Sequence, residues 1–553
     1  MREVNMKRCF YNNDNNCFFY RQWKYGLGFS EKEIREYIRQ YKGSNITDFS
    51  INTFGQTSMF PSENLETELS LGKRMFDESR KTDNCGVHNP NFSLDWRKDL
   101  TNLWESGLDF IQIWIDELRS IGIRPWVSIR TNDLHHNFND EWFHTDFRRS
   151  LKGACDIVRH RKPIDLSEKN LDYSFEIVRK HFLDVVKETL ERYDVDGVEL
   201  DWMREADCFA YGGEFFGREI LTEFMREVKN EVVKAEHRYG HKIEIGIRCL
   251  TTPQYNQEIG LDVLRWAKEG LVNIIVPSSR YSSIDNNTPY YFWKQIVEPY
   301  GVEVLAGFDL LMSTNHFDWD EWDPTFGPKK INNVETVFGS AAAFLAQGVD
   351  GLYFFNYFDN MFDCKNCGVE TYLQAKNSGE TSLHKAEGFF RLWFEMTLDE
   401  RVYELPRRII YTYTDKAPLW RCRTPFQTTM SIDNGLPREL YGYDKNGVIT
   451  PAFFRIETGK ILPNSKVVLY LGLHKPLSEI EGFTLFVNSK QVRYVGKKEC
   501  VLPKLTKADL YAFEIDNNGD LPDVQIVEIY VDGKESGGRL DYLEISINKN
   551  FEE

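Results

Sequence analysis

Residues 195–204 read VDGVELDWMR, and this stretch decides the fold. Successive side chains of an extended strand point to opposite faces, so positions 197, 199 and 201 share one face. The valine and the leucine between them face the other way and suit a covering layer of helices. Glu199 and Asp201 therefore point inward together. The strand has an apolar outer face and an acidic inner face, and Arg204 follows where the chain leaves it.

The same unit, a short β-branched or aromatic run followed by an amphipathic stretch, recurs between residues 8 and 400. The predicted strands are 9–11, 48–54, 125–130, 195–201, 243–248, 272–276, 302–308 and 351–356. Ser30 with Glu33 three residues later predicts a capping box at the start of the first helix. Eight such units close most economically as a (β/α)8 TIM barrel, because a ring of covered parallel strands has no exposed edge.

The composition changes after a helix predicted at 383–398. Predicted strands follow at 409–414, 467–473, 483–487, 526–531 and 542–547. Turn pairs such as Asn434-Gly435, Asn446-Gly447 and Asp532-Gly533 separate them. We therefore predict an α/β chain with a catalytic (β/α)8 barrel over residues 1–400 and a C-terminal antiparallel β-sandwich over 405–553. The sandwich is interpreted as structural support, with carbohydrate contact as the alternative.

The charge balance limits the partners of the chain. Its 553 residues carry a formal net charge of −17, which repels nucleic-acid phosphates and anionic membranes. No run of 18 or more apolar residues occurs, and the first residues lack the apolar core of a signal peptide. We therefore expect a soluble, cytoplasmic protein with no nucleic-acid partner and no membrane span.

Cysteine and histidine spacing indicates neither disulfides nor a metal. Ten cysteines are scattered, and the close pair Cys364 and Cys367 is interpreted as a loop thiol pair rather than half of a zinc site. His88, His144 and His316 have no second ligand at a metal-binding spacing. No Gly-rich phosphate-binding loop precedes a helix, so we expect no nucleotide cofactor.

Polar residues gather at the carboxyl ends of the predicted strands, where barrel enzymes build their active sites. They are Asn12-Asn13-Asp14, the segment from Arg130 to His135, the segment from Glu199 to Arg204, Arg248 and Asn356. Acid, base, cation and amide groups are thus expected around one mouth of the barrel.

The roles of the strand-four residues stay open at this point. Glu199 is interpreted first as a buried structural acid held by a neighbouring arginine, and Asp201 as structural or substrate-orienting. Arg204 can bind a carboxylate through two parallel hydrogen bonds, and a surface ion pair is an equally good interpretation. The string is similar to the DGxDxDxE pattern of family 18 chitinases, but Met203 stands where their acid would be. That mechanism lacks its proton donor and is set aside.

The whole set of strand ends resembles glycoside hydrolase family 156, the inverting exo-sialidases. The resemblance rests on Asn13-Asp14, Arg130-x-Asn132-Asp133-x-His135, the strand-four string to Arg204, and Asn356. It implies Asp14 and His135 as the catalytic acid/base pair, with His136 as the alternative histidine. It implies that Arg204, supported by Arg130 and Asn356, binds the sugar, and that the protein pairs with itself. Further candidate substrate ligands are Asn13, Asn132, Asp201 and Arg248.

Simple barrel geometry permits this chemistry. Strands one and three are two steps apart, so at roughly 4.8 Å per step their ends lie about 9–10 Å apart. Inverting glycosidases need roughly 6.5–9.5 Å between acid and base, to hold a water molecule. The expected substrate is a sialylated glycan or another carboxylated sugar, whose carboxylate Arg204 and Arg130 suit. Two alternatives remain: a retaining glycosidase on a neutral or uronic sugar using Asp201 and Asp309, and a non-catalytic binder of a carboxylated sugar.

Overall fold

The computed structural model describes most of the barrel and much of the second domain. The described residues are 7–71, 90–133, 144–158, 169–204, 206–210, 212–279, 284–309, 311–312, 330–331, 334–355, 396–412, 436, 438–440, 442, 451–498, 509–532 and 538–547. The predicted helix at 383–398, the Cys364 and Cys367 pair, and the three turn pairs lie wholly or largely outside these ranges.

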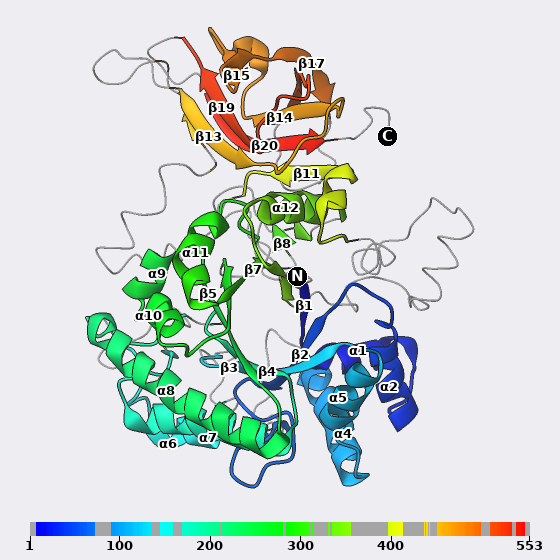
Figure 1. The fold of residues 1–553 in the computed structure, drawn as a ribbon, viewed down its shortest axis with the longest axis vertical. Coiled ribbons are helices and arrows are strands. Elements are labelled where there is room, and N and C mark those ends of the chain that lie inside the picture. Colours follow the sequence, from blue (N-terminus) through cyan, green and yellow to red (C-terminus); the bar gives the residue numbers. More distant parts are fainter. Residues whose placement is uncertain are drawn as a thin grey trace.

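Eight parallel strands form a closed barrel, which confirms the predicted fold class (Figure 1). The strands are β1 (Arg8–Asn13), β2 (Asp48–Phe54), β3 (Arg124–Arg130), β4 (Gly197–Asp201), β5 (Glu244–Leu250), β6 (Ile274–Ser278), β7 (Glu303–Phe308) and β10 (Gly351–Phe355). Each strand pairs with its neighbours in chain order, and β10 closes the ring against β1. The predicted strand positions agree with these bounds to within a few residues.

Helices cover the outside of the barrel. They are α1 (Asn16–Tyr25), α2 (Glu31–Arg39), α4 (Pro90–Glu105), α5 (Phe110–Ser120), α6 (Asp146–Leu151), α7 (Glu176–Arg192), α8 (Glu214–Tyr239), α9 (Pro253–Glu258), α10 (Val263–Lys268), α11 (Tyr290–Val297) and α12 (Val334–Ala346). The capping box predicted from Ser30 and Glu33 is present at the start of α2. The main core cluster fills the layer between strands and helices.

Antiparallel strands build the second domain, as predicted. One sheet contains β11 (Arg407–Ile410), β12 (Arg438–Leu440), β14 (Val467–Leu473), β17 (Arg493–Lys498), β18 (Asp509–Ile515) and β20 (Gly538–Ile547). The other contains β13 (Ala452–Glu457), β15 (Thr484–Val487), β16 (Lys490–Gln491) and β19 (Val524–Tyr530). A separate hairpin pairs β8 (Leu311–Met312) with β9 (Lys330–Ile331). One apolar cluster joins residues of both large sheets, so they pack as a sandwich.

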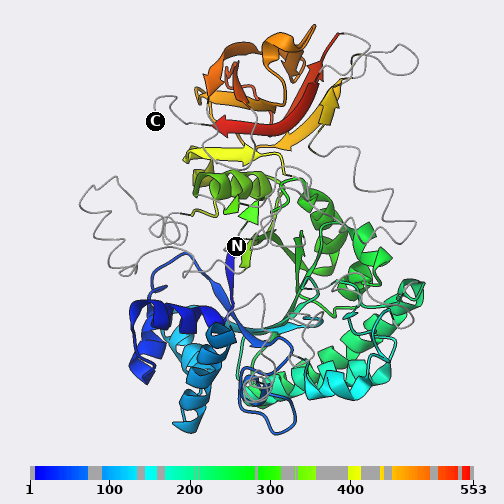
Figure 2. The same ribbon diagram turned by 180° about the vertical axis from the view of Figure 1, so that it is seen from behind.

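The sandwich rests on the barrel through close backbone contact. Helix α12 lies against β11, and both views show the sandwich beyond that helix (Figures 1 and 2). A Cβ atom on Gly339 of α12 would lie 2.1 Å from the carbonyl oxygen of Arg408, so only glycine permits this approach. Asn286, in the loop after β6, donates to the carbonyl of Ile410 at 2.7 Å and accepts from Ser340 at 2.6 Å. The two domains are therefore joined by direct polar contacts.

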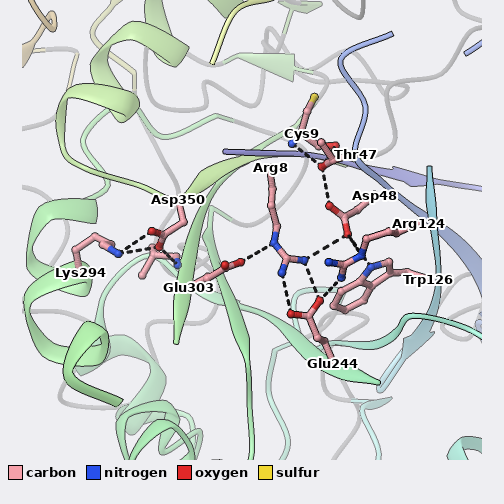
Figure 3. Close-up of polar contacts among 11 residues, drawn as sticks. Arg8, Cys9, Thr47, Asp48, Arg124, Trp126, Glu244, Lys294, Glu303 and Asp350 are labelled. Atoms are coloured by element: carbon pink, nitrogen blue, oxygen red, sulfur yellow. Dashed lines mark hydrogen bonds and ion pairs between the residues drawn. The ribbon is translucent and has the colours of Figure 1, made fainter. Parts of the chain in front are cut away.

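Charged side chains close the amino end of the barrel (Figure 3). Arg8 contacts Asp48 at 3.3 Å, Glu244 at 2.8 Å and Glu303 at 2.6 Å. Arg124 also contacts Asp48 at 3.2 Å and pairs with Glu244. These five residues come from five different strands. The network ties the strand starts together, and it lies at the end opposite to the predicted site.

The middle of the barrel is a packed apolar plug. It consists of Phe10, Trp126, Ile274, Val276, Leu305, Tyr353 and Phe355, all buried. Trp126 is anchored because its Nε1 donates to Asp48 at 3.0 Å. The charged network fills the amino end of the barrel and the apolar plug fills its middle. A catalytic site inside the barrel is therefore expected at the carboxyl ends of the strands.

We expect Gly197→Ala to destabilise the barrel by about 1–3 kcal/mol, the usual range for overpacking a dense core. The added Cβ would lie 2.4 Å from the ring of Trp126, which the bond to Asp48 prevents from moving away. Chemical denaturation would measure this change. Gly246→Ala is the matched control, because its Cβ meets the same ring at 3.2 Å and should cost less. Equal midpoints for both variants would contradict this account of the packing.

Candidate active site

A chain of alternating acids and arginines joins the ends of three strands. Arg130, the last residue of β3, donates to Asp14 Oδ2 at 2.9 Å and to Asp133 Oδ2 at 2.9 Å. Asp14 follows directly after β1, and Arg204 beyond β4 lies 3.8 Å from Asp133. Although burial alone lowers the pKa of Arg130, the charges of Asp14 and Asp133 raise it. The predicted convergence of strand ends one and three is thus present for Asp14 and Arg130.

A second ion pair lies beside this chain. Arg248 of β5 donates to Asp201 Oδ2 of β4 at 2.9 Å and lies 4.0 Å from Asp309, just after β7. Its guanidinium carbon lies 3.6 Å from the ring centre of Phe355, a stacking contact. Burial lowers the pKa of Arg248, but Asp201, Tyr353 and Asp309 together outweigh it and raise that pKa. Both the acid and the cation of this pair are buried, so we interpret the pair as a structural part of the site.

The strand register explains this arrangement. Arg130 lies opposite Asp201 in the β3–β4 pairing, and Asp201 lies opposite Arg248 in the β4–β5 pairing. Three consecutive strands therefore present cation, anion and cation at the same height. Asp201 therefore lies between two arginines in register, and one of them, Arg248, is bonded to it.

Glu199 lies one inward position below Asp201. Its Oε1 accepts from Asn12 Nδ2 and from Ser128 Oγ, both at 2.8 Å. Both of these bonds come from neutral donors, and the expected arginine acts on this acid through its charge, because Arg248 favours the ionised form of Glu199. Burial first, and then the charge of Asp201, raises the pKa of Glu199 to about 7.

Two predicted substrate ligands lie outside this cluster. Asn13 alternates to the outer face of β1, where its amide donates to the hydroxyls of Tyr11 at 2.9 Å and Tyr37 at 3.1 Å. Asn132 bonds both backbone groups of Leu171, donating to its carbonyl at 3.2 Å and accepting from its N–H at 3.1 Å. Both amides form hydrogen bonds within the protein, Asn13 to two tyrosine hydroxyls and Asn132 to the backbone of a loop. We therefore do not retain them as sugar ligands.

The remaining predicted residues fall outside the described ranges. These are His135, its alternative His136, and Asn356. Their roles stay predictions. Sequence reasoning also left Asn12, Ser128 and Asp133 without a role, although the alternation of inward positions along β1 and β3 places the first two in the interior.

Solvent exposure separates the accessible groups from the structural ones. The side chain of Asp14 is 13% exposed and that of Arg204 is 21% exposed. By contrast, the side chain of Asp201 is 0% exposed and that of Arg248 is 3% exposed. Of these four side chains, Asp14 and Arg204 are therefore the more accessible to a ligand that enters from the carboxyl end.

Within the described ranges no group of three or more His, Cys, Asp or Glu side chains is arranged to hold a metal ion. None of the helices the structure describes is long and apolar enough to cross a membrane.

Comparisons with known proteins return distant likenesses. No protein-family model and no curated protein matches the sequence. Similar solved structures include α-L-fucosidase isoenzyme 2 from Paenibacillus thiaminolyticus, with 11% identity over 70% of this chain and a TM-score of 0.37. A glycoside hydrolase family 138 enzyme targeting pectin rhamnogalacturonan II has 9% identity over 73% of this chain and a TM-score of 0.36. The α-amylase from Geobacillus thermoleovorans, complexed with acarbose, has 11% identity over 96% of this chain, 99% of its own, and a TM-score of 0.32.

This chain spans 49% of the length of the fucosidase and 38% of that of the family 138 enzyme. Likenesses this distant carry no argument about activity. Membership in glycoside hydrolase family 156 therefore stays a prediction from the sequence motifs.

Proposed function

We propose that this protein is a glycoside hydrolase that removes a terminal sialic acid, or a closely related carboxylated sugar, with inversion of configuration. The observation that carries the proposal is the partly exposed acid Asp14, bonded to Arg130 at 2.9 Å at the carboxyl end of a closed barrel. That end is where barrel enzymes place their chemistry.

Asp14 and His135 form the proposed acid/base pair. One protonates the leaving glycosidic oxygen while the other deprotonates the attacking water, which enters from the opposite side of the sugar. Arg130 orients Asp14 through its fork, whose second branch is fixed on Asp133. A guanidinium held at both branches supports one rotamer of Asp14.

Arg204 is the proposed ligand of the sugar carboxylate. A sialoside carries that carboxylate on its anomeric carbon, so the site has to hold an anion beside a developing positive centre. Among Arg130, Arg204 and Arg248, the side chain of Arg204 is the most exposed, at 21%. Guanidinium groups bind carboxylates through two parallel hydrogen bonds, which also fixes the plane of the ligand.

The retaining alternative uses Asp201 and Asp309. Both acids contact Arg248, Asp201 at 2.9 Å and Asp309 at 4.0 Å, so they belong to one side of the site. However, Asp201 has no exposed side-chain surface and is bonded to both Arg248 and the N–H of Met203. A nucleophile has to reach the anomeric carbon, so burial disfavours Asp201 in that role.

The stereochemistry of the reaction distinguishes these two readings. We expect wild-type protein to release free sialic acid from a fluorogenic α-sialoside, with the β-anomer appearing first in NMR spectra. His135→Ala should lower that turnover by at least about a hundredfold. An α-anomer as first product would support retention, and binding of free sialic acid without any release would support the non-catalytic reading.

A further inference from the structure

Glu199 connects the two strands whose ends carry the Asp14–Arg130 pair. Its single oxygen Oε1 takes hydrogen bonds from Asn12 and from Ser128, each at 2.8 Å. Asn12 stands two residues before Asp14, and Ser128 stands two residues before Arg130. All four residues therefore point to the same interior, with Glu199 one step below the ion pair.

This connection crosses the interior of the barrel. The strand order is β1-β2-β3-β4, so β1 and β3 are not hydrogen-bonded to each other. Glu199 bonds Ser128 of the adjacent strand and also reaches Asn12, three strands away. Backbone pairing fixes each strand against its neighbour, whereas this carboxyl group fixes the ends of β1 and β3 against each other.

We propose, on the premise of the function given above, that Glu199 is a positioning residue: through Asn12 and Ser128 it sets the strand ends so that Asp14 meets Arg130 in working geometry. Glu199 is buried below the ion pair, so it acts through these neighbours and not on the sugar. Misplacement of a reacting group by about 1 Å costs on the order of a hundredfold in rate.

Ionisation of Glu199 tunes this positioning. Burial first, and then Asp201, raises its pKa to about 7, whereas Tyr353 and Arg248 oppose the rise. Within the described residues, these are the titratable or charged groups with the largest effects on Glu199, and they lie on β4, β10 and β5. Hydrogen bonds to an ionised carboxylate are stronger than those to the neutral acid, so the strand ends are held more firmly as pH rises through this value.

Three variants separate this role from a merely structural one. Glu199→Leu removes the acceptor, while Glu199→Gln keeps an acceptor oxygen and removes the titration. Glu244→Gln is the matched control, because it neutralises an acid of the network at the amino end of the same barrel. The readouts are kcat/KM on a fluorogenic sialoside, and amide hydrogen exchange over residues 8–15 and 124–133 against pH.

We expect Glu199→Leu to lower kcat/KM about a hundredfold and to speed exchange in both segments about tenfold. Glu199→Gln should keep exchange slow but lose the further gain in exchange protection that wild type and Glu244→Gln show as pH rises through about 7. The proposal is overturned if Glu199→Gln keeps that gain, or if Glu199→Leu leaves exchange unchanged. If the leucine variant does not fold, the pH dependence of exchange in the glutamine variant decides. If wild type hydrolyses no sialoside, the proposed function fails, and the exchange data still decide the positioning role.

Discussion

Asp14→Asn is expected to lower kcat on a sialoside by about a thousandfold, while the affinity for free sialic acid stays within about threefold of wild type. Asparagine keeps the size of the side chain and an oxygen that can accept from Arg130, so the pocket keeps its shape. It cannot give or take the proton that hydrolysis needs. Steady-state kinetics with a fluorogenic sialoside and calorimetric titration with sialic acid give the two numbers.

Two control variants make this result specific. Asp48→Asn changes a buried acid that also contacts an arginine of β3, but at the amino end of the barrel, and should leave kcat within about threefold. Asp309→Asn tests the retaining alternative, which requires that acid for chemistry. Full activity of Asp14→Asn combined with an inactive Asp309→Asn would transfer the catalytic role to the second pair.

Arg248→Met is expected to destabilise the protein by about 3–5 kcal/mol, because it leaves buried carboxylates without their cation. Asp201 loses the bond at 2.9 Å and Asp309 loses a partner at 4.0 Å. Such a loss is a large part of the roughly 5–15 kcal/mol that holds a typical domain together. Urea denaturation followed by tryptophan fluorescence would measure the shift.

The double variant Asp201→Asn with Arg248→Met should recover part of this loss, since it removes the uncompensated charge together with its partner. Arg226→Met is the surface control: this arginine pairs with Glu269 at 2.9 Å at an exposed site, and its loss should shift the unfolding midpoint far less than Arg248→Met. If Arg248→Met lowered the free energy of unfolding no more than Arg226→Met, the Arg248–Asp201 ion pair would not stabilise the site.

The fold followed from local patterns in the sequence. The alternation over residues 195–204 places acids inside and aliphatic residues outside, and the structure confirms β4 with this orientation. The capping box at Ser30 and Glu33 was equally predictable from the sequence, because both of its partners lie within four consecutive residues. Patterns of short range are readable because strand and helix periods fix which side chains share a face.

The partners of each charge were less predictable. That Asp14 meets Arg130 follows from parallel strands ending at one rim, but the choice of Arg248 for Asp201 depends on the register of β4 against β5. The bond from Asn12 to Glu199 depends on the tilt of strands across the whole ring. Local periodicity contains neither quantity, so it could not show that neutral donors bond Glu199 while Arg248 acts on it through charge.

The most direct test is a crystal structure of the Asp14→Asn variant soaked with a sialoside. The account predicts an intact sugar at the carboxyl end of the barrel, with its carboxylate on Arg204 and its glycosidic oxygen or a bound water within about 3.2 Å of the side chain of residue 14. A sugar bound at another place in the chain, or one whose anomeric centre lies out of reach of residue 14, would contradict it.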